Sequence, residues 1–358
     1  MHNLITIHDV AKRAGVSIGT VSNVINQKNK VAPDTTERIL DAIKELNYIP
    51  NTVAKSLKTS QSRIIGILAE DVNAFSSGAI IDGICQYCED HDHAVNLCNL
   101  RVNEKVDYTQ SSMYTQLEIS ASFQSSVQKS LNLLTTSRVD GLVYIGVHPR
   151  DVGNILPHTD IPVIYTYSYT KENDYCVNYD DYQGAQLVVE FLLNMGHKRI
   201  GLICGSIDSV SAHKRLMGYQ NALMEHGLPY YPEYIRSGNW LYEDGYRSCM
   251  ELLSLPSPPT AIFSMSDLMA YGAVNAAYDQ GLQIPGDISI HGFDDLDLST
   301  FIRPALSTVH LPLREMGLKA AEVMIHILEH EPVPDDERGI LLPCTLVPRS
   351  SIRENPME

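Results

Sequence analysis

The sequence predicts an α/β protein in two parts: a small all-α headpiece, followed by a large two-lobed body with parallel sheets. The chain has 358 residues, which is too long for one ordinary domain and long enough for a small domain plus a large one. Its first 60 residues carry the apolar spacing of three short helices. From residue 61 onward, short apolar runs alternate with segments long enough for helices, which predicts parallel sheets with helices on both faces.

The composition is that of an ordinary globular protein. Hydrophobic residues make up 44% of the chain and charged residues 20%. No stretch approaches the roughly 20 consecutive apolar residues that a membrane helix needs. The first residues lack the basic start and apolar run of a signal peptide. We therefore expect a cytoplasmic protein.

The charge is distributed unevenly along the chain. The net charge is −16, but residues 1–60 hold eight Lys/Arg and five Asp/Glu, a balance of +3 that leaves −19 for the remainder. An acidic body is repelled by the phosphate backbone of DNA, so any DNA affinity must come from the small basic segment, used twice in a dimer.

Residues 6–26 predict two short helices around a tight turn. Thr6 can cap the first helix, Gly15 tolerates the left-handed conformation that ends it, and Ser17 can cap the second. The inward positions are Val10, Ala11, Ala14, Val21, Val24 and Ile25. The second helix then presents Ile18, Gly19, Thr20, Ser22, Asn23 and Asn26 outward.

A third amphipathic helix is expected over residues 33–46, with Ile39, Leu40, Ile43 and Leu46 inward. Together the three helices indicate a helix-turn-helix, whose second helix enters the major groove. Asn side chains can bond adenine there, and Thr and Ile methyl groups can touch thymine. The alternative from spacing alone is a three-helix packing module with an uncharged face.

Residues 6–26, 47–51 and 54–57 closely resemble the headpiece of the lactose/galactose-repressor family. The resemblance implies that Ile18, Gly19 and Asn23 occupy base-reading positions. Asn23 departs from the arginine most common there, so a standard family operator is not expected. Ala32 replaces the usual cap of the third helix, although Asp34 or Thr35 can serve. The DNA-binding residues expected are Thr6, Ser17, Ile18, Gly19, Thr20, Ser22, Asn23, Asn26, Asn51, Ala54, Lys55, Leu57 and Lys58.

The resemblance also identifies residues 51–58 as a hinge helix that ends the headpiece. Eight residues are too few to form a stable helix alone, so we expect this one to fold only when paired with its dimer partner on DNA. The family pattern places Leu57 as an apolar wedge in the minor groove that kinks the duplex. The alternative for Leu57 is an ordinary exposed leucine in a linker.

The body begins at residue 61. Strands are expected at residues 64–69, 95–98, 141–145, 162–165, 200–204, 261–263 and 288–293, and helices near 78–90, 182–195, 212–226, 243–254, 267–280 and 313–330. Ligands of such folds lie beyond the carboxyl ends of the strands, where the loops converge.

Five segments of the body resemble the periplasmic-binding-protein-like core of the same family, namely residues 196–200, 215–219, 267–272, 292–295 and 303–309. The resemblance implies two lobes joined by three crossovers. The first lobe is expected at about 61–163 and 293–320, and the second at about 164–292 and 321–358. Residues 101–130 are Ser/Gln-rich and are expected to form a variable loop and helix without an assigned function.

The resemblance further implies a small effector, and the chemistry of the matched residues indicates a sugar. A sugar offers hydroxyl groups and an apolar ring face, so its site needs an aromatic plate beside charged or amide groups. The ligand-binding residues expected are Asn73, Phe75, Tyr165, Ser211, Arg215, Trp240 and Asp267. The alternatives are core packing for the aromatic residues and an interlobe salt bridge for Arg215 with Asp267.

The sequence predicts no enzyme and no cofactor. No Gly-rich phosphate loop, His-Glu-x-x-His or Gly-x-Ser-x-Gly motif is present, and the adjacent Asp294 and Asp295 are expected to cap a turn. The seven cysteines suit reduced thiols. Cys85 and Cys88, with His91 and His93, can suggest a metal cluster, but two cysteines on the buried face of a helix is the favoured interpretation.

These features predict a homodimeric, sugar-responsive repressor that binds a pseudo-palindromic double-stranded DNA operator. One alternative is the same fold responding to a purine or another metabolite as corepressor. The other is a solute-binding module that does not bind DNA, which the headpiece and the missing signal peptide both disfavour.

Overall fold

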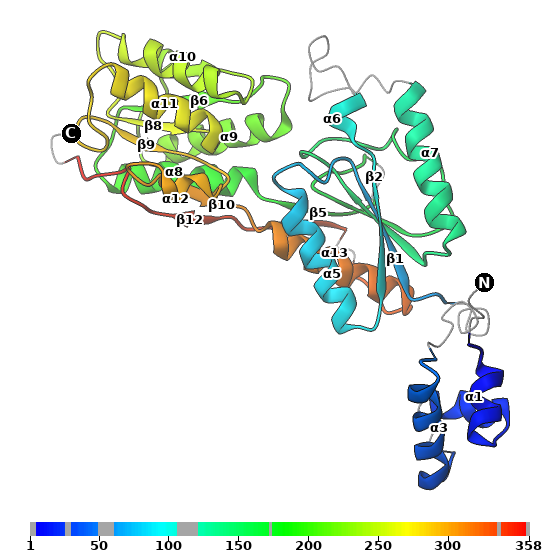
Figure 1. Ribbon diagram of the computed structural model, residues 1–358. Coiled ribbons are helices and arrows are strands. Elements are labelled where there is room, and N and C mark those ends of the chain that lie inside the picture. Colours follow the sequence, from blue (N-terminus) through cyan, green and yellow to red (C-terminus); the bar gives the residue numbers. More distant parts are fainter. Residues whose placement is uncertain are drawn as a thin grey trace. The chain divides into compact units, whose positions relative to one another are not determined.

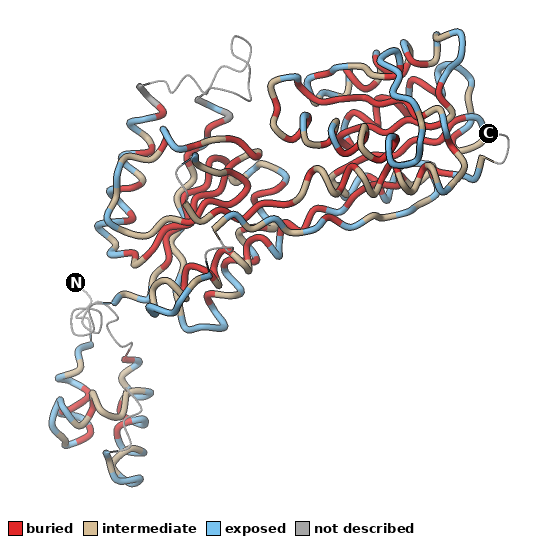
Figure 2. Tube along the Cα trace, turned by 180° about the vertical axis from the view of Figure 1, so that it is seen from behind, coloured by how far each residue is buried: buried red, intermediate tan, exposed pale blue. Residues whose placement is uncertain are grey.

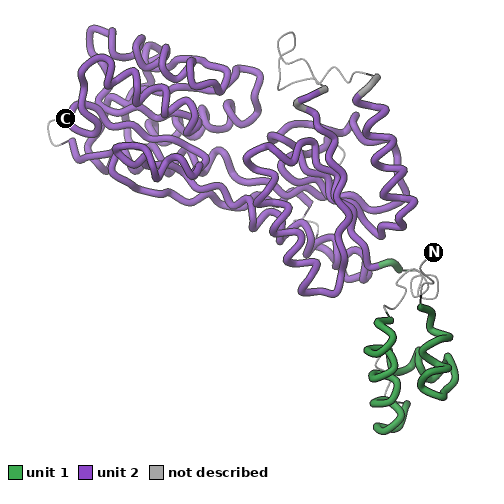
Figure 3. The backbone as a smooth tube through the Cα atoms, in the orientation of Figure 1, with its two compact units in different colours: residues 1–62 green, residues 63–358 purple. Residues whose placement is uncertain are grey.

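The computed structural model describes residues 5–25, 30–48, 61–105, 121–171, 174–334 and 338–355. The chain forms two compact units, residues 1–62 and 63–358 (Figure 3). We describe each unit by itself and call them the headpiece and the body. The sequence analysis placed the boundary between them after residue 60.

The headpiece consists of α1 (Ile7–Ala14), α2 (Ile18–Ile25) and α3 (Pro33–Glu45). Its core is formed by the buried side chains of Val10, Ala11, Ala14, Val21, Ile39, Ala42 and Tyr48. The expectation that Leu40 points inward is wrong, because its side chain is 53% exposed. The inward face of α3 runs through Ile39, Ala42 and Ile43 at helical spacing, and Leu40 lies about a quarter-turn away from it.

The expected turn between α1 and α2 is confirmed. The Thr6 backbone N–H and hydroxyl both donate to Asp9 Oδ2, at 2.9 and 2.7 Å, and so fix the start of α1. Gly15 ends α1 in the left-handed conformation, with φ = 67°. Ser17 Oγ accepts the Thr20 backbone N–H at 3.2 Å and caps α2. At α3, Ala32 provides no side-chain cap, and Pro33 occupies the first helical position instead.

The first lobe of the body contains a six-stranded parallel sheet (Figure 1). Its strand order is β11 (Gly339–Leu342), β5 (Tyr175–Tyr179), β4 (Val163–Thr166), β3 (Gly141–Ile145), β1 (Ile64–Ala69) and β2 (Ala94–Asn99). Helices α5 (Ser77–Asp90) and α13 (Leu313–Leu328) cover one face, and α7 (Ala121–Thr136) covers the other. The short α6 (Val102–Lys105) precedes α7.

The second lobe contains a four-stranded parallel sheet of β7 (Ile235–Ser237), β6 (Ile200–Cys204), β8 (Ala261–Ser264) and β9 (Ser289–His291), in that order. The pair α8 (Asp181–Asn194) and α9 (Val210–Glu225) and the pair α10 (Tyr242–Leu253) and α11 (Asp267–Asp279) pack as layers against it. Smaller elements are η1 (Pro232–Tyr234), α12 (Leu298–Phe301) and an antiparallel pair, β10 (Thr308–His310) with β12 (Thr345–Val347). Strands β1, β3, β6, β8 and β9 are almost wholly buried, as the red stretches of Figure 2 indicate, whereas the edge strands β2, β7 and β11 are partly exposed.

The lobe boundaries expected from the sequence need correction. Strands β4 and β5 pair with β3 and extend the first sheet, so the first lobe continues to residue 179. Helix α13 packs against α5, and β11 pairs with β5, so residues 313–328 and 339–342 return to the first lobe. Residues 293–310 and 345–355 belong to the second lobe, where β10 pairs with β12. The three crossovers therefore follow β5, β10 and β11.

Helices α10 and α11 approach closely because glycine occupies two of the contacts between them. A Cβ at Gly245 of α10 would lie 1.9 Å from the Met269 carbonyl oxygen of α11, and one at Gly272 would lie 2.1 Å from the Tyr242 carbonyl oxygen. These contacts bring the amino-terminal ends of α10 and α11 together at the carboxyl edge of the second sheet. Among the helices that the structure describes, none is long and apolar enough to cross a membrane.

Candidate ligand cavity and DNA-binding surface

A cavity of about 400 Å³ lies between the two lobes of the body, at the carboxyl ends of their strands. Both lobes contribute to its wall. The residues that line it are Ala74, Phe75, Val147, His148, Pro149, Tyr167, Tyr179, Ser209, Ser211, Arg215, Trp240, Ser266, Leu268, Asp294 and Leu296. A cavity of this size can hold a mono- or disaccharide or a nucleobase.

The first lobe contributes an aromatic wall. The Phe75 ring meets the Tyr167 ring edge to face, with centroids 6.5 Å apart and planes at 89°. Tyr167 in turn lies 5.8 Å from Tyr179. Tyr167 and Tyr179 are buried, whereas Phe75 is 50% exposed at the mouth of the cavity. Such rings can pack against the apolar face of a ligand.

The second lobe contributes Trp240, whose backbone is held in the left-handed region with φ = 69°. A tryptophan there costs on the order of 1–3 kcal/mol, so the surrounding structure must hold it in place. Gly205, directly after β6, makes room for the ring, since a Cβ at that position would lie 2.0 Å from Trp240 Cζ2. The sequence analysis did not single out Gly205, because its role depends on a contact with a distant residue.

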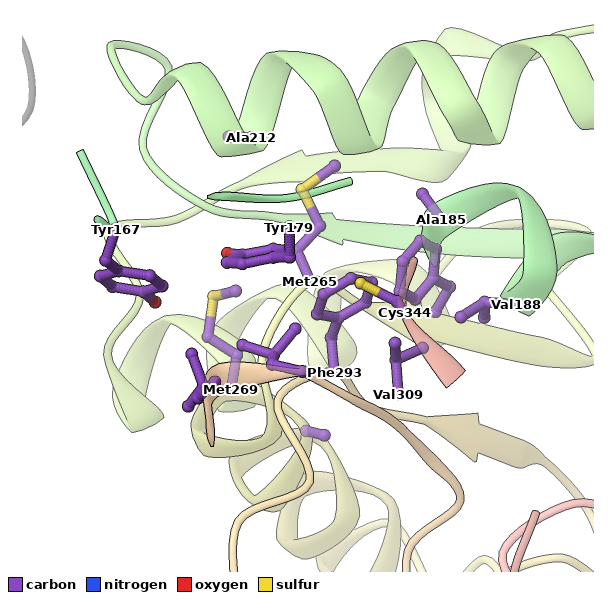
Figure 4. Packing of buried hydrophobic residues seen from close by; sticks show 14 of the residues in the cluster. Tyr167, Tyr179, Ala185, Val188, Ala212, Met265, Met269, Phe293, Val309 and Cys344 are labelled. Carbon is purple, nitrogen blue, oxygen red and sulfur yellow. The ribbon is translucent and has the colours of Figure 1, made fainter. Parts of the chain in front are cut away.

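Arg215 of α9 is fixed in the cavity wall by a buried network. Its Nε donates to Asp181 Oδ1 at 2.7 Å, its Nη2 donates to the Tyr179 hydroxyl at 2.9 Å, and its Nη1 donates to the Met265 carbonyl. The guanidinium carbon lies 3.7 Å from the centroid of the Phe293 ring. Figure 4 shows Tyr179, Met265 and Phe293 gathered in this core.

The charges around Arg215 keep it ionised. Burial alone would lower the pKa of Arg215, but the neighbouring Tyr179, Asp181 and Asp294 more than offset this effect and raise it. Asp294 Oδ1 lies 3.8 Å from Arg215 Nη1. Burial raises the pKa of Asp294 well above its ordinary value, although Arg215 opposes the shift. The cavity therefore holds a fixed cation beside a carboxyl group that can accept or donate a hydrogen bond.

Ser211 adds a hydroxyl group from the first turn of α9. Its Oγ is buried and has no hydrogen-bond partner in the described part of the chain. A buried polar atom without a partner is costly, and a ligand in the cavity can satisfy it. Ser209 and Ser266 cap α9 and α11 and also line the cavity.

Of the expected ligand-binding residues, Phe75, Ser211, Arg215 and Trp240 lie on the cavity wall, whereas Asn73 does not. Asn73 is exposed, and its backbone N–H donates to Asp71 Oδ1. Its neighbours along the chain, Ala74 and Phe75, provide that part of the wall.

Tyr165 also lies away from the cavity. It sits inside β4 and packs against Tyr144, with ring centroids 5.8 Å apart, in the apolar layer under α7. The tyrosine on the wall is Tyr167, just beyond the carboxyl end of the same strand. Tyr165 therefore corresponds to the core-packing alternative.

Asp267 lies behind the wall instead of on it. Its carboxylate accepts hydrogen bonds from the Thr308 hydroxyl at 2.6 Å, the Ser299 hydroxyl at 2.7 Å and the Leu296 backbone N–H at 2.9 Å. It forms no salt bridge with Arg215, and Asp294 is the acid on the wall. Asp294 was expected only to cap a turn. Its place in the loop after β9, three residues beyond the end of that strand, was the available signal for a site residue.

The headpiece presents the expected surface on α2. Ser17, Ile18 and Gly19 are exposed, and Thr20, Ser22 and Asn23 are half-buried along the same helix. Thr6 is exposed at the start of α1. The remaining expected DNA-binding residues, Asn26, Asn51, Ala54, Lys55, Leu57 and Lys58, lie outside the described residues.

The cysteine pair on α5 does not share one buried face, because Cys88 is buried while Cys85 is exposed. His91 stacks on Tyr87 with ring centroids 4.0 Å apart. Within the ranges that the structure describes, no group of three or more His, Cys, Asp or Glu side chains is arranged to hold a metal ion.

A helix-turn-helix with an exposed second helix, joined to a two-lobed body with a ligand-sized cavity, defines a ligand-responsive DNA-binding regulator. Comparisons with known proteins agree. The family model "Bacterial regulatory proteins, lacI family" matches residues 6–51, and the model "Periplasmic binding protein-like domain" matches residues 189–352. The chain belongs to the lacI family and is a DNA-binding transcriptional repressor. The family and the fold class expected from the sequence are thus confirmed.

Relatives and solved structures are similar over nearly the whole chain. The HTH-type transcriptional repressor PurR of Haemophilus influenzae (strain PittEE) is 34% identical over 91% of this chain and 92% of its own length. PurR of Pasteurella multocida (strain Pm70) is 32% identical over 97% of this chain and 98% of its own length. A Lac repressor dimer bound to operator and the anti-inducer ONPF is 28% identical, with a TM-score of 0.77, and the match covers 98% of this chain and 100% of that chain. A complex of the regulator CelR with cellobiose is 26% identical, with a TM-score of 0.63, and the match covers 97% of this chain and 99% of that chain.

Proposed function

We propose that the protein is a homodimeric repressor of sugar-utilisation genes, controlled by a small carbohydrate bound in the cavity between the lobes. The observation that carries the proposal is the pairing of aromatic faces with a fixed cation, a carboxyl group and serine hydroxyls in one cavity. The same protein binds a pseudo-palindromic operator through two copies of α2.

The chemistry of the wall fits a carbohydrate. Each sugar hydroxyl both donates and accepts hydrogen bonds, and Arg215 donates where Asp294 can accept. The unpartnered hydroxyl of Ser211 can serve either role. The ring of Trp240 offers a flat apolar surface to the sugar ring. One structural neighbour is itself a complex with cellobiose.

A purine acting as corepressor is the second candidate. The similarity of the chain to relatives named HTH-type transcriptional repressor PurR favours this candidate. A purine base would stack on the same aromatic side chains and place polar atoms at Arg215 and Asp294. A solute-binding module without DNA binding is disfavoured by the match of the headpiece to the regulator family.

On the DNA side, we propose that Ile18, Gly19 and Asn23 contact base edges, and that residues 51–58 form a hinge helix with Leu57 as its wedge. An amide at position 23 can bond adenine bidentately, so the operator differs from one selected by arginine. A ligand that contacts both lobes favours one angle between them, and in a dimer that angle sets the spacing of the first lobes. The coupling between effector and operator is typically about 1–3 kcal/mol and acts in both directions.

The test is a thermal-shift screen of monosaccharides, disaccharides and nucleobases on the full chain. Hits are then titrated into an operator-binding assay on selected duplexes, with random DNA as competitor. A binding ligand raises the unfolding temperature by mass action and changes operator affinity by about 5- to 150-fold. A sugar that does both supports the proposal, and a nucleobase that does both favours the second candidate. No preference for any duplex over random DNA, with or without ligands, would contradict the DNA-binding part.

A further inference from the structure

A buried ion pair lies in the first lobe, behind the wall of the cavity described above, which we call the effector cavity. Glu70, directly after β1, is fully buried, and Arg150, in the loop after β3, is 3% exposed. Arg150 Nη2 donates to Glu70 Oε1, although the two residues are 80 apart in the sequence. Neither residue lines the effector cavity. Any role of the pair in effector binding is therefore indirect.

The carboxylate of Glu70 fixes the loop that follows β3. Besides Arg150, its Oε1 accepts a hydrogen bond from the Tyr144 hydroxyl, and its Oε2 accepts the Val147 backbone N–H at 2.9 Å. The start of the loop, at Val147, and its end, at Arg150, are thus held by one side chain. Between them, residues 147–149 line the effector cavity.

The same pair is connected to the segment after β4. The Arg150 carbonyl accepts the Tyr169 backbone N–H at 3.0 Å, and Tyr169 lies two residues after Tyr167, which lines the effector cavity. Gly146 allows the two loops to approach, since a Cβ there would lie 2.5 Å from the Tyr167 carbonyl oxygen. The loops after β3 and β4 therefore form one unit, and the buried pair anchors it.

His148, at the centre of the loop after β3, is kept neutral. It lines the effector cavity between Val147 and Pro149. Burial, and next the charge of Arg150, lower the pKa of His148 well below its ordinary value. A neutral imidazole has one nitrogen that donates and one that accepts, whereas an imidazolium only donates. Arg150 therefore favours a His148 that keeps an acceptor nitrogen as well as a donor.

Stability alone does not explain a buried ion pair at this position. Replacing such a pair by apolar side chains of similar volume is often neutral or stabilising, because removing two charges from water is costly. Apolar side chains could fill the same space, but they would offer no acceptor to the Val147 N–H. The pair supplies a direction for the loop that packing does not supply.

We propose that Glu70 and Arg150 are positioning residues of the effector cavity. They hold residues 147–149 and the segment of Tyr167 in the geometry that binds the effector. This inference rests on the proposed effector site and applies whichever ligand occupies it. The second-lobe side chains of the wall, such as Trp240, do not depend on the pair.

Two variants separate positioning from stability. Glu70→Leu removes the carboxylate that compensates the charge of Arg150, and we expect the unfolding temperature to fall by about 10 °C. The double variant Glu70→Leu/Arg150→Met removes both charges and should recover most of this loss. The matched control is Asp82→Leu/Arg314→Met, a pair at 2.8 Å in the same lobe, with side chains 66% and 44% exposed. Neither control residue lines the effector cavity.

Hydrogen–deuterium exchange of the full chain, followed by mass spectrometry, measures the loops directly. In the double variant, the amides of residues 147–152 and 167–169 should exchange about tenfold or more faster than in the wild type, because the Val147 N–H has lost its acceptor. Exchange in α9 and α11 should stay unchanged, and the control should match the wild type in these segments. Unchanged exchange of residues 147–152 in a folded double variant, or faster exchange over both lobes, would overturn the proposal.

Ligand binding gives a second readout. Glucose, galactose and cellobiose are titrated by calorimetry into the wild type, the double variant and the control, without DNA. A sugar that binds the wild type should bind the double variant about tenfold more weakly and the control equally well, since a displaced wall loses its hydrogen bonds to the ligand. Equal affinity in wild type and double variant would contradict the positioning role. Failure of all these sugars to bind the wild type would count against the proposed effector class, and the exchange result would still decide the role of the pair.

Discussion

Arg215 and Asp181, 34 residues apart in the sequence, form an ion pair at 2.7 Å in which both side chains are almost completely buried, at 3% and 2% exposure. Asp181 begins α8 and Arg215 lies on the adjacent α9. The pair determines the orientation of the guanidinium group in the effector cavity. It therefore contributes to stability as well as to binding.

Removing one member of this pair should strongly destabilise the body. In Arg215→Met, Asp181 is left as a buried charge without its partner, and we expect the free energy of unfolding to fall by about 3–5 kcal/mol. Urea unfolding followed by circular dichroism measures the change. Arg236→Met is the matched control, because Arg236 pairs with Glu251 at 2.8 Å and both side chains stay partly exposed, at 22% and 49%. The free energy of unfolding of that variant should fall by less than about 1 kcal/mol. Similar losses in both variants would show that burial of the Arg215 pair is unimportant.

Asp267 should make the stability of the body depend on pH. Burial raises the pKa of Asp267 from 3.8 to about 6, although three hydrogen bonds to the carboxylate oppose the shift. The folded chain then binds an extra proton between about pH 4 and 6. The contribution of Asp267 to the free energy of unfolding is therefore greatest below this range and is lost as the pH rises through 6. The stability of the wild type relative to Asp267→Asn should therefore fall by up to about 3 kcal/mol between pH 4 and pH 7.

The measurement for Asp267 is urea unfolding at several pH values, monitored by the fluorescence of Trp240. The exposed Asp160 provides the control variant Asp160→Asn, since its side chain is fully accessible to water. A pH-independent difference between wild type and Asp267→Asn, or one that grows with pH, would contradict the assignment.

Trp240 should report and strengthen effector binding. We expect Trp240→Leu to weaken the binding of the effector by about 1–2 kcal/mol, because the variant loses the aromatic ring that packs on the ligand while keeping Arg215 and Asp294. Titration calorimetry measures the affinity, and the wild-type fluorescence should change on saturation. Tyr231→Leu is a suitable control, since Tyr231 is exposed and does not line the effector cavity. An unchanged affinity in Trp240→Leu together with a silent wild-type signal would exclude Trp240 from the site.

Asn23 should select one base pair of the operator. On α2 it is half-buried among the residues expected to face the groove. We expect Asn23→Ala to lose about 1–3 kcal/mol of discrimination at one position in each half-site, with little change in the salt dependence of binding. Selection from a randomised operator library measures this preference. If wild type and variant select the same sequences with equal stringency, Asn23 does not contact a base.

The sequence by itself determined the parts of this protein that depend on neighbours along the chain. Helix α1 ends at Gly15 and α2 begins at Ser17 because a left-handed glycine and a capping hydroxyl act within one turn. The alternation of apolar runs and amphipathic segments likewise indicated the parallel sheets before their pairing was known. For these elements, local propensity and periodicity are enough to predict the structure.

Only the tertiary structure decided which side chains meet in the effector cavity. Tyr165 and Tyr167 are two residues apart, yet one packs in the core and the other forms the wall, depending on where β4 ends. Asp267 turns its carboxylate toward Ser299 and Thr308, so that Asp294 reaches the cavity instead. The return of α13 and β11 to the first lobe depends on pairing across more than a hundred residues. These positions are set by long-range packing, because the fit of one segment depends on the shape of a partner that is distant in the sequence.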